Sequence, residues 1–198
     1  MDNQPIGMFD SGLGGLTVVK EIKKVLPNED IVYLGDIARL PYGTRSKETI
    51  VKFSLEDTAF LISKKVKSIV IACNTASAIA YPTLKKKFKL PILEVVKPTV
   101  MEAIQKTKNK RIGVLGTRAT VVSGAYSRMI KKLNPKLNVF EQEASLLVPL
   151  VEEGEIKGNL VEEMVRRYLQ PLLNKKIDTL ILGCTHYPLL LPKVHNPV

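Results

Sequence analysis

The two cysteines of this 198-residue chain, Cys73 and Cys184, each follow a short apolar segment that suits a buried strand. Each is followed at once by polar residues, which are Asn74 and Thr75 in one case and Thr185 and His186 in the other. A single free cysteine is most often a small buried apolar residue. Matched polar neighbours at both positions favour a shared chemical role instead, at strand ends where open α/β sheets bind ligands.

Two thiols on opposite sides of a bound molecule could invert a stereocentre. One thiolate would remove a proton from carbon, and the other group, still a thiol, would deliver a proton to the opposite face. A free cysteine has a pKa of about 8.5, which is close enough to neutrality for neighbouring groups to tune. The candidates for exchanging protons with the sulfurs are Asp10 for Cys73, and His186 with Glu152 for Cys184.

Composition is typical of a soluble globular protein, with 45% hydrophobic and 25% charged residues. The net charge of +11 comes mainly from short lysine runs with few aromatic residues nearby, which favours a solvated surface over a nucleic-acid interface. No apolar run is long enough for a membrane span, and the N-terminus lacks the pattern of an export signal. We therefore expect a cytoplasmic protein with a small-molecule substrate, no nucleic-acid partner and no membrane partner.

Alternating strand and helix patterns predict an α/β fold. In the first half we expect strands at 5–9, 31–34, 68–72 and 91–96, and helices at 17–26, after Ser46 and from the Cys73 turn to about Phe88. In the second half we expect strands at 111–116, 137–140 and 179–182, a loop and helix within 117–133, a helix at 144–153 and a helix capped by Asn159.

The pattern of the first half restarts in the second. Ile6-Gly7 recurs as Ile112-Gly113, and the two cysteines are separated by nearly the same interval. This predicts two similar lobes, 1–97 and 98–198, each a mostly parallel sheet flanked by helices, with the active site in the cleft between them. The interval also places the last expected strand beyond residue 198, so we expect the first lobe to be incomplete.

Two loops are further candidates for binding. Residues 10–15 are rich in glycine, which permits close backbone approach to a ligand, but they match neither a dinucleotide fingerprint nor a P-loop. Asp10 could equally cap the following helix. Residues 36–43 crowd charged, proline, tyrosine and glycine residues into one loop, for which a rigid turn and a binding role are about equally supported.

Six segments together resemble the glutamate racemase family. They are FDSGLGGLTV, GDIARLPYG, IACNTASA, GTRATVVSGAY, PLVEEG and ILGCTHYPLL, and they extend from Phe9 to Leu190. This family interconverts L- and D-glutamate for bacterial peptidoglycan without a cofactor. The resemblance implies Cys73 and Cys184 as the two acid/base residues on opposite faces of the substrate Cα, with Asp10 assisting Cys73, and with Glu152 and His186 assisting Cys184.

The resemblance also implies a set of substrate contacts, which are Asp10, Ser11, Pro41, Tyr42, Gly43, Asn74, Thr75, Thr117, Thr120, Thr185 and His186. It gives Asp36 no separate chemical role. It implies no metal and no cofactor, pyridoxal phosphate included, and a homodimer is compatible with it. Ile37 and Thr99 differ from the residues that are usual in the family, and family members continue for several dozen residues past the last motif.

Other functions remain open from the sequence alone. The chain could be a relative that binds glutamate without turning it over, or another amino-acid racemase of the same superfamily. A reversible disulfide between the two cysteines is a third hypothesis, although the chain has no C-x-x-C pair. A zinc site that includes Cys184 and His186 is disfavoured, because the C-x-H spacing is a poor match to zinc-binding patterns.

Overall fold

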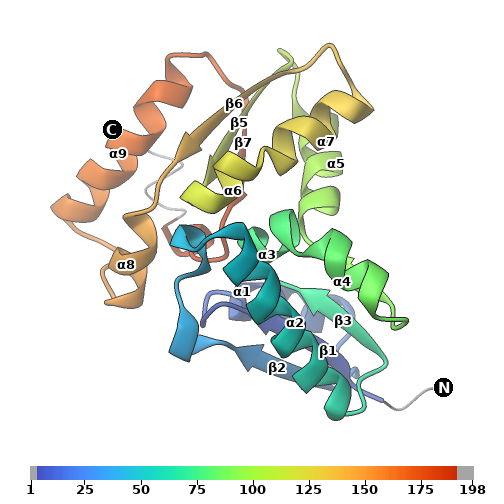
Figure 1. Cartoon of the computed structure of the whole chain (residues 1–198). Coiled ribbons are helices and arrows are strands. Elements are labelled where there is room, and N and C mark those ends of the chain that lie inside the picture. The colour runs from blue at the N-terminus through green and yellow to red at the C-terminus, as the bar shows by residue number, and fades with distance from the viewer. Residues whose placement is uncertain (1–3, 191–198) are drawn as a thin grey trace. The chain divides into compact units, whose positions relative to one another are not determined.

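The computed structural model describes residues 4–190 and divides the chain into two compact units. The first unit ends at Val95 and the second begins at Val96. Each is an α/β unit built on one parallel sheet, as Figure 1 shows. Residues 191–198, which the predicted second lobe includes, lie outside the described part. Between residues 4 and 190, none of the helices has the length and apolar character needed to cross a membrane.

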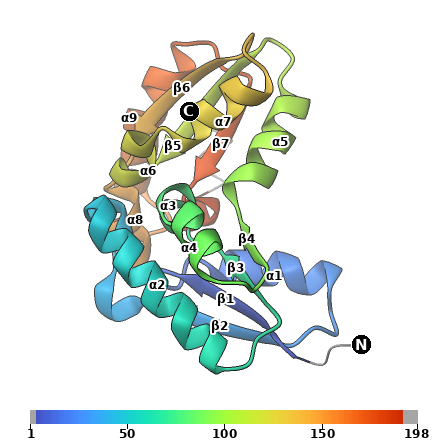
Figure 2. The ribbon, with the colours of Figure 1, turned by 45° about the vertical axis from the view of Figure 1, so that its right-hand side comes forward.

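The sheet of the first unit has the strand order β2-β1-β3-β4, and its strands are β1 (Ile6–Asp10), β2 (Ile31–Gly35), β3 (Ser68–Ile71) and β4 (Ile92–Glu94). Its helices are α1 (Leu16–Val25), α2 (Lys47–Ser63), α3 (Asn74–Ile79) and α4 (Tyr81–Lys87), with short 3₁₀ turns at Ile37–Arg39 and Tyr42–Thr44. Figure 2 shows α1 and α2 on different sides of this sheet.

The sheet of the second unit has the strand order β6-β5-β7, and its strands are β5 (Arg111–Gly116), β6 (Asn138–Glu143) and β7 (Thr179–Gly183). Its helices are α5 (Val96–Lys106), α6 (Arg118–Ser123), α7 (Ala125–Leu133), α8 (Leu147–Glu152) and α9 (Asn159–Leu173), and a 3₁₀ turn covers Tyr187–Leu190. Helix α9 lies on one side of this sheet, and α5 and α7 lie on the other (Figure 1).

The two sheets share one plan, which confirms the predicted pair of similar parallel sheets flanked by helices. In each unit the first strand, β1 or β5, lies between the strand that follows it and the strand that leads to a cysteine. Because all pairings are parallel, the carboxyl ends of these strands meet at one edge of each sheet. Polar residues that follow different strands are thereby brought together within each unit.

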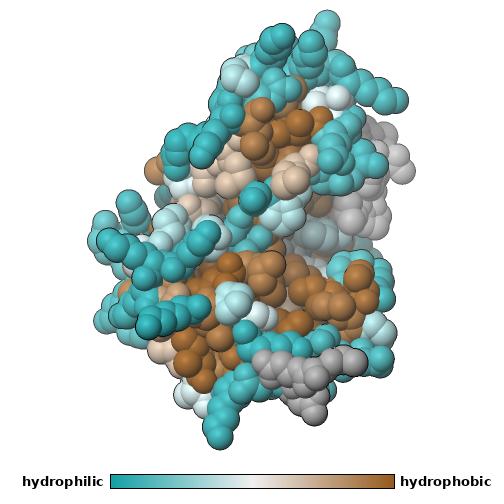
Figure 3. All heavy atoms as spheres, turned by 90° about the vertical axis from the view of Figure 1, so that its right-hand side faces the viewer, coloured by the Kyte–Doolittle hydropathy of each residue, from teal (hydrophilic) through white to brown (hydrophobic). Residues whose placement is uncertain are grey.

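The cores follow from the strand and helix periodicities. In the second unit, β5 and α9 contribute Leu115, Val165 and Leu169 to one buried apolar cluster. In the first unit, Ile6 and Met8 of β1 face the side on which α1 packs. Helix α1 itself has no buried residue, and Val25 remains 78% exposed. Figure 3 shows apolar side chains gathered on the surface of this unit.

Several predicted boundaries were wrong, each for a local reason. The helix expected from the Cys73 turn to Phe88 is two helices that meet at Ala80, because Pro82 lacks the N–H that a continuous helix requires. The helix expected within 117–133 is also two, and they are separated by Gly124 at a φ of 58°. Gly158, not Asn159, is the N-terminal cap of α9. The predicted cap at Ser46 is confirmed, because its hydroxyl accepts from the Thr49 N–H.

The helix expected at 144–153 is also shorter than predicted. It begins only at Leu147 and ends at Glu152, although Gly154 follows it at a φ of 81° as the sequence indicated. Ala144 lies before the helix, where its N–H donates to the Gly116 carbonyl and extends the pairing of β6 with β5. Glu152, a candidate catalytic residue, is therefore the last residue of a six-residue helix.

Replacing Leu115 with alanine tests the packing of the second unit. Leu115 is fully buried, so the Leu115→Ala variant should lose about 2–5 kcal/mol of unfolding free energy through lost burial and a residual cavity. The matched control is Val122→Ala, because Val122 is 80% exposed on α6 and its truncation should change stability by less than about 0.5 kcal/mol. Urea unfolding measures both changes, and similar losses in the two variants would contradict this packing.

Candidate active site

Cys73 lies just beyond β3 and is the N-terminal cap of α3. Its sulfur accepts a hydrogen bond from the Ala76 N–H at 3.4 Å, and its thiol lies 3.8 Å from the Ser11 hydroxyl oxygen. The side chain is only 4% exposed. The structure thus places Ser11, which follows β1, directly against the sulfur that follows the neighbouring strand.

Asp10 ends β1 and is completely buried. Its Oδ2 accepts hydrogen bonds from the Gly15 N–H at 2.9 Å and the Gly12 N–H at 3.3 Å. The carboxylate therefore holds the glycine-rich turn before α1, whose N-terminal cap is Gly15. Residue 15 has to be glycine, because a Cβ there would lie 2.5 Å from the Asp10 Cβ and 2.7 Å from the Tyr33 hydroxyl.

The environment of Cys73 opposes ionisation of the thiol. Burial is the main cause, and the negative charge of Asp10 adds to it, so the pKa of Cys73 is raised to about 12. The hydrogen bonds from Ala76 and Ser11 act in the opposite direction without overcoming these two effects. With these neighbours, Cys73 is a protonated thiol at neutral pH.

The second cysteine has a different set of neighbours. Cys184 follows β7 directly, and its sulfur lies 3.7 Å from Nδ1 of His186. The other ring nitrogen of His186, Nε2, contacts Oε1 of Glu152 at the end of α8. Thr185 lies beside the same imidazole, with its hydroxyl oxygen 3.5 Å from Nδ1. Sulfur, imidazole and carboxylate thus form a continuous chain along which a proton can move.

Two threonines lie at the same edge of the second sheet. Thr117 follows β5, and its hydroxyl accepts from the Thr120 N–H as the N-terminal cap of α6. The two hydroxyl oxygens are 3.0 Å apart, and both side chains are buried. Gly116 pairs with Gly183, so the residues that follow them, Thr117 and Cys184, lie at neighbouring positions of this edge.

The tyrosine of the segment 41–43 is buried inside the first unit. Tyr42 is completely buried, and its hydroxyl contacts Asp36 and lies 2.8 Å from Oδ2 of Asp57. Burial and these two carboxylates raise the pKa of Tyr42. The phenol is therefore engaged inside the first unit, and a substrate contact by this segment would use its backbone. That contact stays a prediction.

The candidate residues thus fall into two groups, one at the sheet edge of each unit. The group of the first unit comprises Asp10, Ser11, Cys73, Asn74 and Thr75, and that of the second comprises Thr117, Thr120, Glu152, Cys184, Thr185 and His186. Almost all are buried, and Glu152 is half-buried. Over residues 4–190, no three His, Cys, Asp or Glu side chains are grouped so that they could hold a metal ion.

Sequence reasoning did not single out Asp57. It lies in the middle of α2, only 2% exposed, on the same helical face as Ile50 and Leu61. A signal was present, because the carboxylate falls at the helical spacing of buried apolar residues, where an acidic residue needs partners. Of its partners, Arg39 was noted only as a member of a crowded loop, and Tyr42 as a member of that loop and as an implied substrate contact.

Comparison with protein families decides what kind of protein carries these two groups. A family model described as Asp/Glu/Hydantoin racemase matches residues 6–198, which is nearly the whole chain. The chain belongs to this racemase family. Among curated relatives, the glutamate racemase of Aquifex aeolicus is 53% identical over 191 residues, which are 96% of this chain and 74% of that protein. The glutamate racemase of Streptococcus sanguinis is 47% identical over 99% of this chain and 74% of that protein.

Solved structures of racemases have the same fold. The glutamate racemase of Francisella tularensis in complex with D-glutamate matches 98% of this chain and 73% of its own, with a TM-score of 0.92 and 45% identity. The Escherichia coli glutamate racemase, in complex with L-glutamate and an activator, matches 98% of this chain and 74% of its own at 31% identity and a TM-score of 0.83. An aspartate racemase of Picrophilus torridus, 22% identical at a TM-score of 0.67, shares the fold alone.

Removing the charge of Asp10 tests its influence on Cys73. In the Asp10→Asn variant the remaining side-chain oxygen can still accept from the glycine turn, but the negative charge that opposes the thiolate is gone. The pKa of Cys73 should therefore fall by roughly one pH unit. The measurement is the pH dependence of alkylation at Cys73 by a small thiol reagent, followed by peptide mass spectrometry.

The control for this experiment is Asp30→Asn, which makes the same chemical change at an exposed position of the first unit. It should leave the alkylation profile of Cys73 unchanged. An unaltered profile in Asp10→Asn as well would show that the charge of Asp10 does not act on the thiol.

Proposed function

We propose that this racemase interconverts L- and D-glutamate without a cofactor, with Cys73 and Cys184 acting on opposite faces of the substrate Cα. The observation that carries the proposal is the chain from Cys184 through His186 to Glu152, which gives the sulfur a proton acceptor. The glutamate racemases that are about half identical to this chain support the choice of substrate.

In one direction of the proposed reaction, a cysteine thiolate removes the Cα proton and becomes a thiol. The thiol of the other cysteine delivers its proton to the opposite face and becomes a thiolate. The substrate is then inverted, and the two sulfurs have exchanged protonation states. Proton exchange through Asp10 on one side, and through His186 and Glu152 on the other, restores the starting state.

The raised pKa of Cys73 sets a requirement for this mechanism. The thiol has to lose its proton when the substrate is bound, although burial and the charge of Asp10 oppose this. Transfer of the proton from Cys73 to Asp10 would leave the total charge of the site unchanged, which avoids placing two negative charges side by side. The positively charged ammonium group of the substrate would further favour the thiolate.

Recognition of the substrate is assigned to the polar residues beside the two cysteines. We place the α-carboxylate and the side-chain carboxylate of glutamate against the hydroxyl and amide groups of Ser11, Asn74, Thr75, Thr117 and Thr185. The backbone of the segment 41–43 would complete the site. In the cell, we propose that the enzyme supplies D-glutamate for peptidoglycan synthesis in the cytoplasm. The homodimer stays a prediction.

The test of the proposal is proton exchange at Cα in D₂O. Either enantiomer of glutamate should gain deuterium at Cα and lose optical activity when it is incubated with the folded protein. Aspartate, tested in parallel, should react much more slowly. If folded protein gives no exchange but D-glutamate raises its melting temperature, the protein binds glutamate without racemising it, and the proposal fails.

Replacing the cysteines one at a time tests their roles. Cys73→Ala and Cys184→Ala should each lower kcat/KM by roughly 10² to 10⁴ or more, because each removes an acid/base group that the proposed reaction uses. Val122→Ala, at an exposed position, is the control that should retain the full rate. Activity that survives the loss of either cysteine would exclude a two-cysteine mechanism.

Replacing Glu152 with glutamine tests the proton chain behind Cys184. The Glu152→Gln variant keeps a hydrogen-bonding group beside Nε2 of His186 but loses the charge that stabilises a protonated imidazole. We expect kcat/KM to fall by roughly tenfold or more. Because two enantiomers are equally stable, the fall should be equal in the two directions. A normal rate would show that His186 works without the carboxylate.

A further inference from the structure

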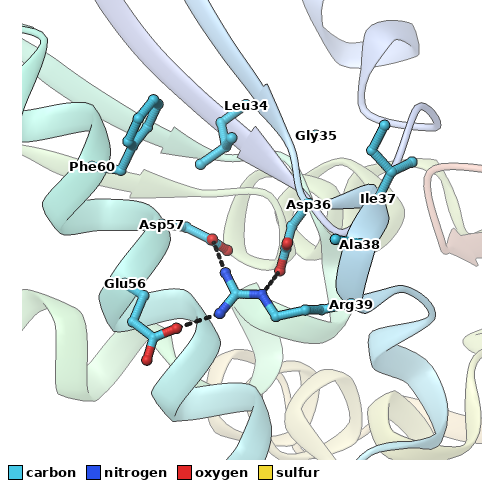
Figure 4. Close-up of a pocket in the computed structure, with 9 residues that line it drawn as sticks. All are labelled: Leu34, Gly35, Asp36, Ile37, Ala38, Arg39, Glu56, Asp57 and Phe60. Carbon is cyan, nitrogen blue, oxygen red and sulfur yellow. Dashed lines mark hydrogen bonds and ion pairs between the residues drawn. The ribbon is translucent and has the colours of Figure 1, made fainter.

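A pocket of about 350 Å³ in the first unit exposes one side of a carboxylate cluster (Figure 4). The turn after β2 contributes Asp36 and Arg39 to it, and α2 contributes Glu56 and Asp57. Leu34 and Phe60 supply apolar walls. This cluster belongs to a single unit, and none of its members was a predicted catalytic or substrate-binding residue.

Arg39 is the centre of the cluster. Its guanidinium donates through Nε to Asp36 at 2.7 Å, through Nη2 to Asp57 at 2.8 Å, and through Nη1 to Glu56. It also lies over the ring of Phe53, 4.4 Å from the ring centre. Burial works against the charge of Arg39, but the hydrogen bonds that it donates to Asp36 and Glu56 raise its pKa, so it is always a cation. One positive charge thus faces three carboxyl groups.

The contacts of the Tyr42 hydroxyl indicate that one carboxyl group of this cluster carries a proton. It contacts Oδ2 of Asp36 and lies 2.8 Å from Oδ2 of Asp57. A phenol carries a single hydrogen and can donate to only one of two carboxylate oxygens. The second close contact is favourable only if that carboxyl group carries a proton and donates it to the phenol oxygen. If both carboxyl groups were ionised, one of the two contacting oxygens would face the phenol oxygen with no hydrogen between them, which is a repulsive contact in the interior.

We propose that Asp57 is a positioning residue and that it acts in its protonated form. It donates its proton to Tyr42, which in turn donates to the carboxylate of Asp36, and this hydrogen-bonded chain fixes the segment 41–43. The other oxygen of Asp57, Oδ1, accepts from Arg39. The arrangement satisfies every close contact of the Tyr42 hydroxyl and leaves Asp36 and Glu56 as the carboxylates that are paired with Arg39.

The surroundings of Asp57 agree with this assignment. Burial raises the pKa of Asp57 to about 7, and the charges of Asp36 and Glu56 act in the same direction. A hydrogen bond donated by Tyr42 to the ionised form and the charge of Arg39 act against it. The group is therefore protonated at mildly acidic pH and ionises as the pH rises through about 7. Because the folded-state pKa lies above the usual value, the stability that it contributes is present at low pH and is lost as the pH rises.

The functional consequence rests on the proposed function, in which the segment 41–43 contacts the substrate. Ionisation of Asp57 removes one hydrogen bond from the Tyr42 hydroxyl and replaces it with repulsion. We therefore expect the segment to hold the substrate less firmly above about pH 7. A residue that acts only by positioning should change KM more than kcat.

Infrared difference spectroscopy tests the protonation of Asp57 without any activity measurement. Between pH 6 and pH 9 the wild-type protein should lose the carbonyl band of one protonated carboxyl group, since ordinary Asp and Glu side chains are already ionised at pH 6. The band should be missing from the Asp57→Asn variant and retained in Asp30→Asn, the exposed control. A wild-type protein without the band, or an unchanged band in Asp57→Asn, would overturn the proposal.

Steady-state kinetics test the positioning role. An asparagine at 57 can still donate to Tyr42 and accept from Arg39, but it cannot ionise. The ratio of the wild-type KM to the Asp57→Asn KM for glutamate should therefore rise from pH 6 to pH 9, by roughly tenfold. Asp57→Leu removes both hydrogen bonds and should raise KM at every pH, with a smaller change in kcat.

The two measurements separate this proposal from the proposed function. A constant KM ratio across the pH range would overturn the positioning role, even if the infrared band is present. If the protein racemises neither enantiomer but shows the band, the proposed function fails and the protonation of Asp57 is upheld. If Asp57→Leu does not fold, the wild-type band and the Asp57→Asn ratio still decide the outcome.

Discussion

In the two-cysteine mechanism proposed above, a buried sulfur has to ionise in surroundings that oppose ionisation. Cys73 lies at the edge of a parallel sheet, where the polar groups of Ser11 and Ala76 reach it but bulk water hardly does. Burial and the charge of Asp10 together hold it in the thiol form. In the proposed mechanism Cys73 stays a thiol until a positively charged ligand binds, and a buried thiol is protected from side reactions.

The two cysteines lie at equivalent sheet edges but have different neighbours. Cys73 has a carboxylate in its environment and a hydroxyl in contact, whereas Cys184 has an imidazole that is backed by Glu152. The topology explains how both arrangements arise, because the shared strand order brings residues after neighbouring strands to one sheet edge. The two units share one strand order, but the groups that could exchange protons with the sulfur differ between them.

Much of this organisation was predictable from residues alone. The strands before Cys73 and Cys184, and the similarity of the two sheets, followed from apolar segments and a repeated spacing. The break near Pro82 was missed, because one continuous helix was expected there, although a proline lacks the donor that such a helix needs. The contacts of Asp57 could not be predicted, because its partners Arg39 and Tyr42 are remote in sequence and meet it only in the folded chain.

The glycine turn before α1 ties Asp10 to one of the least anchored helices of the first unit. Helix α1 has no fully buried residue and packs on the sheet through the partly buried Val18, Val19 and Ile22, so we expect its amide hydrogens to exchange with solvent more readily than those of a buried helix. The carboxylate of Asp10 is held by N–H groups that lead directly into this helix. Fraying at α1 would therefore admit water to Asp10, and solvent protons would gain a route to the buried carboxyl group.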